Sequence, residues 1–215
     1  TFEGIYDNNY NLIYGFGYTR VLQEDNEVKK ELDIFISSYE NIKLQKVKLI
    51  NTSTEKRSVK ISYSIDPVLG VVKDVDRNYV LRKKIDNGLE LKNPYSLEFS
   101  NCISYITVLA KSKDMDVYYD EENYKVEVNI SLSCKEEVEF TIILGCTEKQ
   151  EDISRIQKNF DSVDAIRREF ENTREYWRKL VVKNMKLDDE YLEIMANGWL
   201  LYQTIVCRLF ARSGF

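Results

Sequence analysis

The sequence predicts a mainly β protein with helices at its C-terminal end, that is, an antiparallel β-sandwich followed by helical segments. Two observations support this prediction. From Tyr10 to about Gly145, apolar residues recur at every second position in several short runs, whereas after Glu151 they recur at every third or fourth position. Polar residues fill the alternate positions of the early runs, which favours antiparallel sheets over a parallel sheet buried on both faces.

The clearest predicted strand runs from Tyr124 to Leu132, with apolar residues in strict alternation. Residues 59–65 and 138–144 follow the same pattern. Residues 42–49 also alternate, but the phase slips in the middle of the run, and we expect a β-bulge or a strand break there.

Turn residues separate these runs. Asn51-Thr52-Ser53 and Asp86-Asn87-Gly88 consist of residue types that favour turns, because their side chains bond to nearby backbone or tolerate unusual backbone angles. Each therefore predicts a connection between two strands.

An amphipathic stripe spans 153–177 and predicts linker helices, with a break where Asp161 and Ser162 offer an N-cap. A further helix is expected over 188–210, with acidic residues at its start, where the helix dipole favours them. Its stretch 199–206 is apolar nearly all round, so we expect several of its sides to be buried, either by the sandwich or by elements outside this sequence. The predicted domains are a sandwich over 1–150, a helical linker over 151–181 and the start of a further domain over 182–215.

Composition excludes several classes of function. The 215 residues are 43% hydrophobic and 31% charged, as expected of a globular chain, and the net charge of −5 comes without a basic stripe for nucleic acid. No apolar run is long enough to span a membrane, and the N-terminus has no signal-peptide pattern. The fifteen tyrosines suit half-buried strand positions, with sugar binding as the alternative.

The chain has four cysteines without CxxC spacing and no histidine, so we expect no metal site and no Ser-His or Cys-His catalytic pair. Widely spaced cysteines are interpreted as free thiols, which predicts a cytoplasmic, reducing location.

Several motifs resemble glycoside hydrolase family 94, which includes cellobiose and chitobiose phosphorylases, 1,2-β-oligoglucan phosphorylase and the phosphorylase-like domain of cyclic β-1,2-glucan synthetase. The strongest match is the segment 196–215, Ala-Asn-Gly-Trp-Leu-Leu-Tyr-Gln-Thr followed by Cys-Arg-Leu-Phe-Ala-Arg-Ser-Gly-Phe. Upstream, Gly-Phe-Gly-Tyr-Thr-Arg at 15–20 and Leu-Ile-Asn-Thr-Ser at 49–53 are similar to sandwich motifs of the family. Val-Leu-Gly at 68–70 is a weaker match, and Lys-Asn-Pro-Tyr-Ser-Leu-Glu-Phe at 92–99 is closest to the β-1,2-glucan branch.

The resemblance implies a β-sandwich of the supersandwich type, a helical linker and the first helix of a truncated (α/α)6 barrel. It also implies an inverting reaction in which an Asp protonates the glycosidic oxygen while inorganic phosphate attacks the opposite face. That Asp would lie beyond Phe215, so no catalytic residue is expected in this chain, and the chain alone should be inactive. Neither a metal nor an organic cofactor is implied; phosphate is a co-substrate.

The resemblance also suggests substrate-binding residues. Arg212 is the leading candidate for sugar contact, with Ser213 and Phe215 in the same segment; the alternative for Arg212 is to satisfy carbonyls at a helix C-terminus. Tyr95 and Glu98 are further candidates, although the Asn-Pro-Tyr segment is also explained as a simple turn before a strand.

Two hypotheses therefore remain. In the first, the chain is the N-terminal part of a glycosyltransferase-like inverting phosphorylase acting on β-linked gluco-oligosaccharides, with β-1,2-glucan favoured. In the second, it is a non-catalytic carbohydrate-binding or structural module. Expected partners are an oligosaccharide, a catalytic barrel in the same polypeptide and a second copy in a homodimer, but neither nucleic acid nor a membrane.

Overall fold

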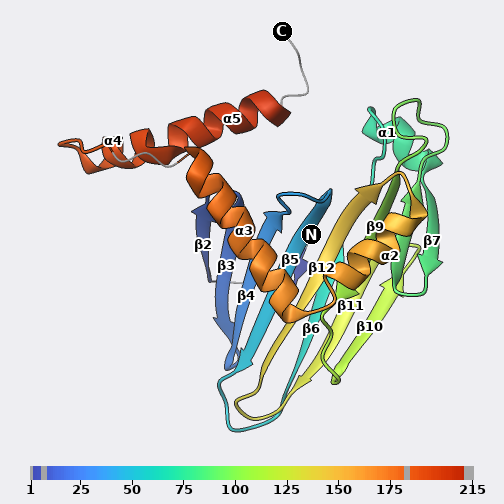
Figure 1. Ribbon diagram of the computed structural model, residues 1–215. Helices are drawn as coiled ribbons and strands as arrows, with labels where there is room; N and C mark the ends of the chain where they lie inside the picture. Colours follow the sequence, from blue (N-terminus) through green and yellow to red (C-terminus); the bar gives the residue numbers. More distant parts are fainter. Residues whose placement is uncertain (1, 6–8, 182–184, 211–215) are drawn as a thin grey trace.

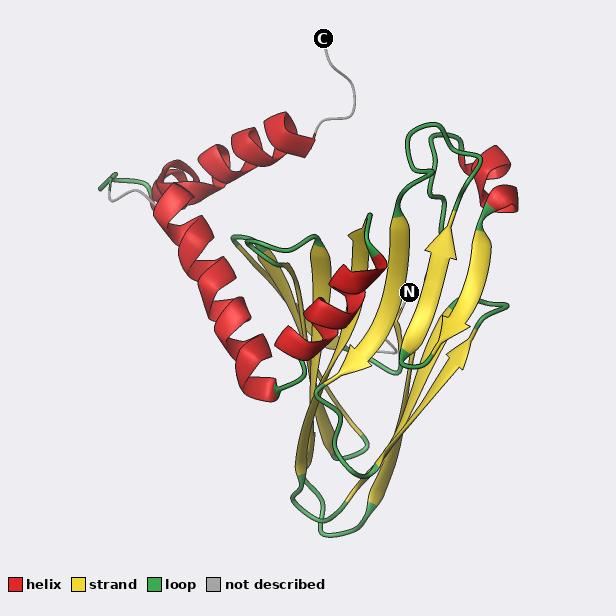
Figure 2. Ribbon diagram, turned by 45° about the vertical axis from the view of Figure 1, so that its right-hand side comes forward, coloured by secondary structure: helices red, strands yellow, loops and turns green. Residues whose placement is uncertain are grey.

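The computed structural model describes residues 2–5, 9–181 and 185–210, which form two antiparallel sheets and a set of helices (Figure 1). The four-stranded sheet has the strand order β1-β6-β11-β10, and the eight-stranded sheet has the order β2-β3-β4-β5-β12-β9-β8-β7. The two sheets pack face to face, and helices lie on the outer side of the larger one (Figure 2). The predicted class, an antiparallel sandwich with C-terminal helices, is confirmed.

The smaller sheet consists of β1 (Phe2–Glu3), β6 (Arg57–Ser64), β11 (Lys125–Leu132) and β10 (Met115–Asp120). The larger sheet consists of β2 (Tyr10–Gly15), β3 (Tyr18–Asp25), β4 (Val28–Ile36), β5 (Ile42–Asn51), β12 (Glu137–Thr147), β9 (Ile103–Leu109), β8 (Gly88–Lys92) and β7 (Leu81–Ile85). The helices are α1 (Lys73–Asp76), the 3-10 turn η1 (Arg77–Tyr79), α2 (Gln150–Asn159), α3 (Val163–Val181), α4 (Glu190–Ile194), the π-helical turn η2 (Met195–Trp199) and α5 (Leu200–Phe210).

The main core fills the space between the sheets. Leu32, Val47 and Phe140 from the larger sheet meet Ile61 and Val128 from the smaller one, and all five are fully buried. Burial of these apolar side chains is the principal force that holds the two sheets together. Strands predicted by alternation at 59–65, 124–132 and 138–144 supply much of this core as β6, β11 and β12.

The predicted bulge or break in residues 42–49 is wrong, because β5 pairs continuously with β4 on one side and β12 on the other. Its apolar residues change face instead. Val47 and Leu49 face the smaller sheet, whereas Ile42 and Leu44 belong to a second core on the helix side. The phase slip therefore marks where helices begin to cover the outer face of the strand.

Helices α2 and α3 form that second core against the eight-stranded sheet (Figure 2). Ile156 of α2 and Phe170 of α3 are buried there, together with Phe160 in the connection. The predicted break is confirmed: α2 ends at Asn159, α3 begins at Val163, and the Ser162 hydroxyl accepts a hydrogen bond from the Ala165 N–H at 3.2 Å. Both helices were therefore predictable from period and capping.

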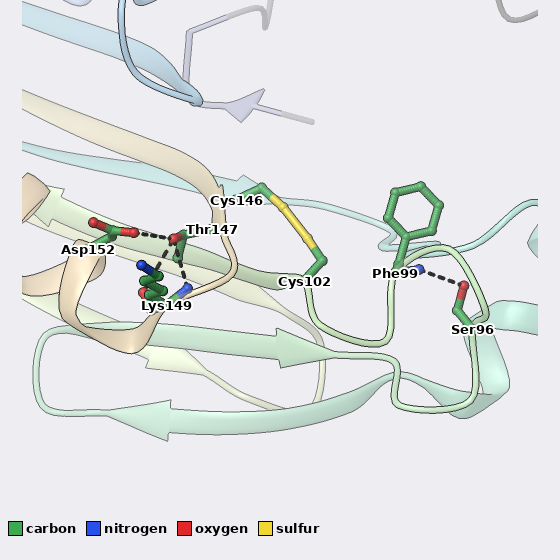
Figure 3. The surroundings of a disulfide bond; sticks show 7 residues. All are labelled: Ser96, Phe99, Cys102, Cys146, Thr147, Lys149 and Asp152. Atoms are coloured by element: carbon green, nitrogen blue, oxygen red, sulfur yellow. Dashed lines mark hydrogen bonds between the residues drawn. A yellow bond between two sulfur atoms is a disulfide. The ribbon is translucent and has the colours of Figure 1, made fainter.

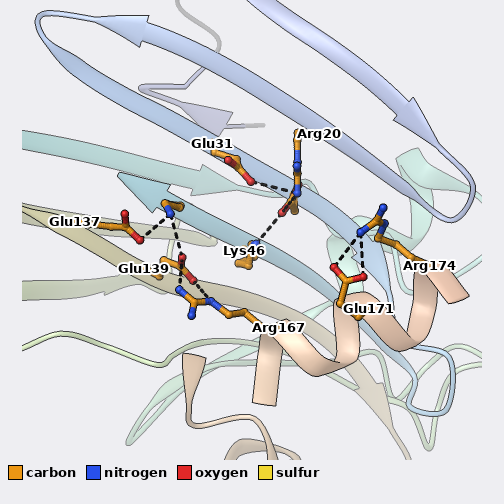
Figure 4. Close-up of polar contacts among 10 residues, drawn as sticks. Arg20, Glu31, Lys46, Glu137, Glu139, Arg167, Glu171 and Arg174 are labelled. Carbon is orange, nitrogen blue, oxygen red and sulfur yellow. Dashed lines mark hydrogen bonds and ion pairs between the residues drawn. The ribbon is translucent and has the colours of Figure 1, made fainter. Parts of the chain in front are cut away.

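A buried ionic cluster lies under α3. The Asp33 carboxylate on β4 is fully buried and lies 2.5 Å from the Arg20 Nε and 2.9 Å from the Lys46 Nζ. Glu31 also pairs with Arg20, at 3.2 Å, near the edge of the cluster (Figure 4). The hydrogen bond to Asp33 raises the pKa of Arg20, which keeps that guanidinium charged.

The C-terminal helices are largely left uncovered by the sandwich. The Asp189 carboxylate caps α4 by accepting hydrogen bonds from the Tyr191 and Leu192 N–H groups, as the acidic start suggested. However, Leu200 of α5 is 53% exposed, and no residue of α5 whose side chain is described is buried. Of the two alternatives for the apolar stretch 199–206, burial of several sides by the sandwich is therefore ruled out for the described chain. Burial by elements outside this sequence stays a prediction.

The interpretation of all four cysteines as free thiols is also wrong. Cys102 and Cys146 form a disulfide that joins the segment before β9 to the end of β12 (Figure 3). Cys134 and Cys207 are free and exposed. The pairing of β9 with β12 brings the two cysteines together, since Cys146 lies opposite Ser104. Disulfides persist mainly in oxidising compartments. The prediction of a cytoplasmic location therefore loses its premise, which was that all four cysteines are free thiols.

None of the described helices is both long enough and apolar enough to cross a membrane. The domain boundaries at 150/151 and 181/182 stay predictions. The first of them falls at the start of α2, directly after the last strand of the sandwich.

Candidate functional site

The loop that contains Tyr95 and Glu98 connects β8 to β9 and is held from both ends. Asn93 is fully buried; its side-chain NH2 donates to the Leu69 carbonyl at 2.9 Å, and its Oδ1 accepts from the Tyr95 N–H at 3.2 Å. The predicted Asn-Pro-Tyr turn is therefore present, with the asparagine side chain as its anchor.

The far half of this loop is anchored near the disulfide. The Ser96 hydroxyl accepts a hydrogen bond from the Phe99 N–H at 3.2 Å, and three residues later Cys102 is bonded to Cys146 (Figure 3). Next to this bond, the Thr147 hydroxyl donates to Asp152 at the start of α2, at 3.0 Å. Both ends of the loop are thus fixed to the sandwich.

The same loop exposes an aromatic surface. Tyr95 is 73% exposed, and its ring lies 5.5 Å from that of Tyr79 in the neighbouring connection between β6 and β7. Val72 and Val75 of that connection are also exposed. Glu98 is exposed at this end of the sandwich. We call the segments 66–80 and 93–102 the end loops; both predicted site residues in the described chain belong to them.

Arg212, Ser213 and Phe215 lie outside the described residues. The motif that precedes them is described, and it joins a second motif from the opposite end of the sequence. The tip of the β2–β3 hairpin, Gly15-Phe16-Gly17, packs on η2 and α5: the ring of Phe16 lies 4.9 Å from Trp199 and 5.5 Å from Tyr202. Trp177 of α3 completes this cluster, 4.9 Å from Tyr202. We call these four aromatic residues and Gly17 the junction.

Two glycines allow the junction to form. Gly17 has a positive φ of 79°, and a Cβ on it would lie 2.0 Å from the Trp177 ring. A Cβ on Gly198 would lie 2.3 Å from the Phe16 ring. Such distances are far below van der Waals contact, so both positions require glycine for the hairpin and helices to meet.

Beside the junction, a cleft of about 490 Å³ opens between the β2–β3 hairpin and α3. Its aromatic side is formed by Tyr14, Phe16, Tyr18 and Trp199. Its polar side is formed by Glu171, Arg174, Glu175 and Arg178, all from α3.

The charged residues of the cleft are paired along the helix. Arg174 Nη1 lies 2.9 Å from a Glu171 carboxylate oxygen (Figure 4), and Arg178 Nε lies 2.9 Å from Glu175. The contacts of the second pair lower the pKa of Glu175 and raise that of Arg178, which favours the ionised form of both groups. The Arg174 guanidinium also lies 5.6 Å from the centres of the Tyr18 and Phe170 rings.

Sequence reasoning did not identify this cleft. The motif at 196–204 contains two of its neighbours, Trp199 and Tyr202, but Tyr14, Arg174 and Arg178 were not singled out. The spacing of acid and base three residues apart on α3 was a visible signal, although such pairs are also common on solvated helices. Within the described ranges, no group of three or more acidic, Cys or His side chains is placed to hold a metal ion.

Comparison with solved structures shows the fold of the chain. A protein assigned as a kojibiose phosphorylase from the human microbiome matches with a TM-score of 0.50 and 14% identity, over 87% of this chain and 26% of that one. A bacterial glucoamylase complexed with acarbose matches with a TM-score of 0.51 and 12% identity, over 94% of this chain and 32% of that one. The chain thus spans about a quarter to a third of these structures.

No curated protein matches the chain. The family model for the supersandwich domain of glycosyl hydrolase 94 matches residues 1–123, more than half of the sequence. Strands β11 and β12 continue the sandwich beyond that match, as far as Thr147. The chain therefore belongs to glycosyl hydrolase family 94, of which it contains the supersandwich domain.

Proposed function

We propose that this chain is the N-terminal part of a carbohydrate-active phosphorylase that transfers a hexosyl group from β-linked gluco-oligosaccharides to inorganic phosphate, with β-1,2-linked glucan as the favoured substrate. Membership of the family supports the carbohydrate class. The preference for β-1,2 linkages rests on the motif at 92–99, which lies in the end loops and carries the exposed Tyr95.

The proposed reaction inverts the anomeric carbon. A carboxylic acid protonates the glycosidic oxygen while phosphate attacks from the opposite face, and that acid needs a raised pKa to remain protonated at neutral pH. In the described chain, the carboxyl groups with clearly shifted pKa values are shifted downwards; for example, hydrogen bonds from Thr147 and Arg155 lower the pKa of Asp152. The proposal therefore assigns the general acid to a residue outside these ranges. It takes phosphate as the co-substrate and involves neither a metal nor an organic cofactor.

The observation that carries the proposal is the junction. Two family-like motifs, at 15–20 and 196–204, come together there, and the Gly17 N–H donates to the Tyr202 hydroxyl at 3.2 Å. This contact fixes the direction in which α5 leaves the sandwich. We infer that this chain fixes the position of a helical catalytic barrel of the same polypeptide relative to the end loops.

The test is an assay of phosphate consumption on β-1,2-, β-1,3- and β-1,4-linked gluco-oligosaccharides. It compares the 215-residue chain with a longer protein from the same reading frame. We expect activity in the longer protein only, highest on β-1,2 linkages, and a raised KM in its Tyr95→Ala variant but not in the matched Tyr118→Ala variant. Folded but inactive longer protein on all three substrates would overturn the proposal.

The second candidate function is a non-catalytic module that binds carbohydrate or holds an assembly together. The exposed Tyr79–Tyr95 pair favours it, since aromatic faces bind sugars without any chemistry. Glucan binding by a longer protein that consumes no phosphate would support this candidate. A homodimer stays a proposal, and light scattering tests it. A cytoplasmic location also stays a proposal, and a count of free thiols on protein from native cells tests it.

A further inference from the structure

The cleft beside the junction has the size of a ligand site. Its volume of about 490 Å³ lies within the range of roughly 300–1,000 Å³ that is usual for small-molecule pockets. It lies between the hairpin and α3, apart from the end loops at the β6–β7 and β8–β9 connections.

The walls of the cleft are held in place before any ligand arrives. Phe16 and Trp199 pack on each other in the junction, and the hairpin tip is fixed by the Gly17–Tyr202 hydrogen bond. Arg174 is fixed by Glu171 and by its contact with the Tyr18 ring. A preformed site loses little conformational entropy on binding, which favours affinity.

The charges of the cleft select the class of ligand. Its two arginines are matched by two glutamates at hydrogen-bond distance, so the polar side carries no net charge. A free anion such as phosphate would have to compete with these carboxylates. A polyhydroxyl ligand, in contrast, can donate to the glutamates and accept from the arginines at once, since each hydroxyl does both.

The aromatic side completes the match. Tyr14 is 64% exposed and, with Phe16, Tyr18 and Trp199, offers apolar surface opposite the ion pairs. A sugar ring has an apolar C–H face and a polar hydroxyl rim, which correspond to these two sides. We propose that this cleft binds a neutral oligosaccharide. The proposal rests on the carbohydrate class of the proposed function and adds a binding site of this chain's own residues to it.

The experiment uses both tryptophans of the chain, which lie in the junction, as the fluorescent reporter. The 215-residue chain is titrated with β-1,2-, β-1,3- and β-1,4-linked gluco-oligosaccharides of two to six units, and separately with sodium phosphate at equal ionic strength. We expect a saturable change with at least one oligosaccharide series and none with phosphate.

Variants locate the site. Tyr14→Ala and Arg178→Ala should each weaken binding by about tenfold. Tyr118→Ala, which removes a similarly exposed tyrosine from β10, should leave it unchanged. Far-UV circular dichroism checks that each variant is folded. If Tyr14→Ala is misfolded, the test rests on Arg178→Ala, because Arg178 lies on the exposed surface of α3.

Three results would overturn the proposal: no saturable change with any oligosaccharide, a stronger response to phosphate than to sugar, or equal loss in Tyr118→Ala and the cleft variants. The outcome is independent of the phosphorolysis assay. If the chain binds sugar at the cleft but the longer protein has no activity, only the proposed reaction is overturned. If the longer protein is active but the chain binds no sugar at the cleft, only the cleft proposal is overturned.

Discussion

The backbone N–H of Gly17 donates a hydrogen bond to the hydroxyl of Tyr202 at 3.2 Å, across 185 positions of the sequence. This bond joins the tip of the β2–β3 hairpin to α5, the last described helix. Around it, Phe16, Trp177 and Trp199 form the aromatic cluster that couples the sandwich to the helices. The direction in which the chain leaves the sandwich therefore depends on a small set of side chains.

Tyr202→Phe tests this coupling, because it removes only the accepting oxygen. We expect α5 to separate from the hairpin more easily, by about 1 kcal/mol, the usual net contribution of one hydrogen bond. Tryptophan fluorescence in a urea titration reports the junction, and far-UV circular dichroism reports the sheets. The fluorescence midpoint should fall while the circular dichroism midpoint stays in place.

The control for this prediction is Tyr191→Phe, since Tyr191 is 81% exposed on α4. It should change neither midpoint. If Tyr202→Phe also leaves the fluorescence midpoint unchanged, the junction is held by ring packing alone.

Asp33→Asn should strongly destabilise the sandwich. The Asp33 carboxylate is fully buried between Arg20 and Lys46, so its loss leaves two cations near the core without their common partner. Breaking a buried ion pair from one side costs about 3–5 kcal/mol. Urea unfolding followed by circular dichroism measures the change.

The matched control for that substitution is Glu31→Gln on the same strand, whose side chain contacts Arg20 but is partly exposed. Its unfolding midpoint should lie close to that of the unchanged chain, because exposed pairs contribute little. Equal effects of the two substitutions would show that Asp33 is not the centre of the cluster.

The disulfide should contribute measurably to stability. Cys102→Ser opens a covalent loop with a sequence separation of 44, and removing a native disulfide of this kind costs about 2–4 kcal/mol. Cys134→Ser, at a free and exposed cysteine, should cost almost nothing. Thermal unfolding with and without a reductant compares them, and a thiol count of two before reduction and four after it would confirm the pairing. Four reactive thiols in untreated protein would contradict it.

Local features of the fold could be predicted from the sequence, whereas its long-range contacts could not. The end of α2, the Ser162 cap and the strand β11 follow from period and capping, which involve residues only a few positions apart. The Gly17–Tyr202 bond and the cleft depend on how distant elements pack, and no spacing in the sequence encodes that distance. The disulfide was missed for the same reason, because it depends on the register between β9 and β12.

The strand β5 shows a subtler limit. Alternation assumes that one face of a strand is buried along its whole length, but β5 is covered by the smaller sheet at one end and by helices at the other. A regular strand then has an irregular hydrophobic pattern. The same hydrophobic pattern is also compatible with a bulge. Only the positions of α2 and α3 distinguish a regular strand that is covered on both faces from a bulged one.

Stability should fall at alkaline pH, and Tyr124 should account for part of that fall. Burial raises the pKa of its phenol above the ordinary value of about 10, and its hydroxyl has no hydrogen-bond partner among the described residues. Below pH 10, Tyr124 is protonated in both the folded and the unfolded chain, so it adds no pH dependence. Above pH 10, the unfolded chain releases the proton while the folded chain keeps it, and the free energy of unfolding falls by up to about 1.4 kcal/mol per pH unit.

Tyr124→Phe should therefore flatten the decline of unfolding free energy between about pH 10 and pH 11.5. At pH 7 it should be neutral or slightly stabilising, because it removes a buried hydroxyl that makes no hydrogen bond. Tyr118→Phe, at an exposed position on β10, should leave the alkaline decline unchanged. Urea titrations at half-unit pH intervals measure both variants. Parallel declines for Tyr124→Phe and the unchanged chain would mean that Tyr124 ionises as readily in the folded chain as in the unfolded one, and its burial would then not be the cause of the alkaline instability.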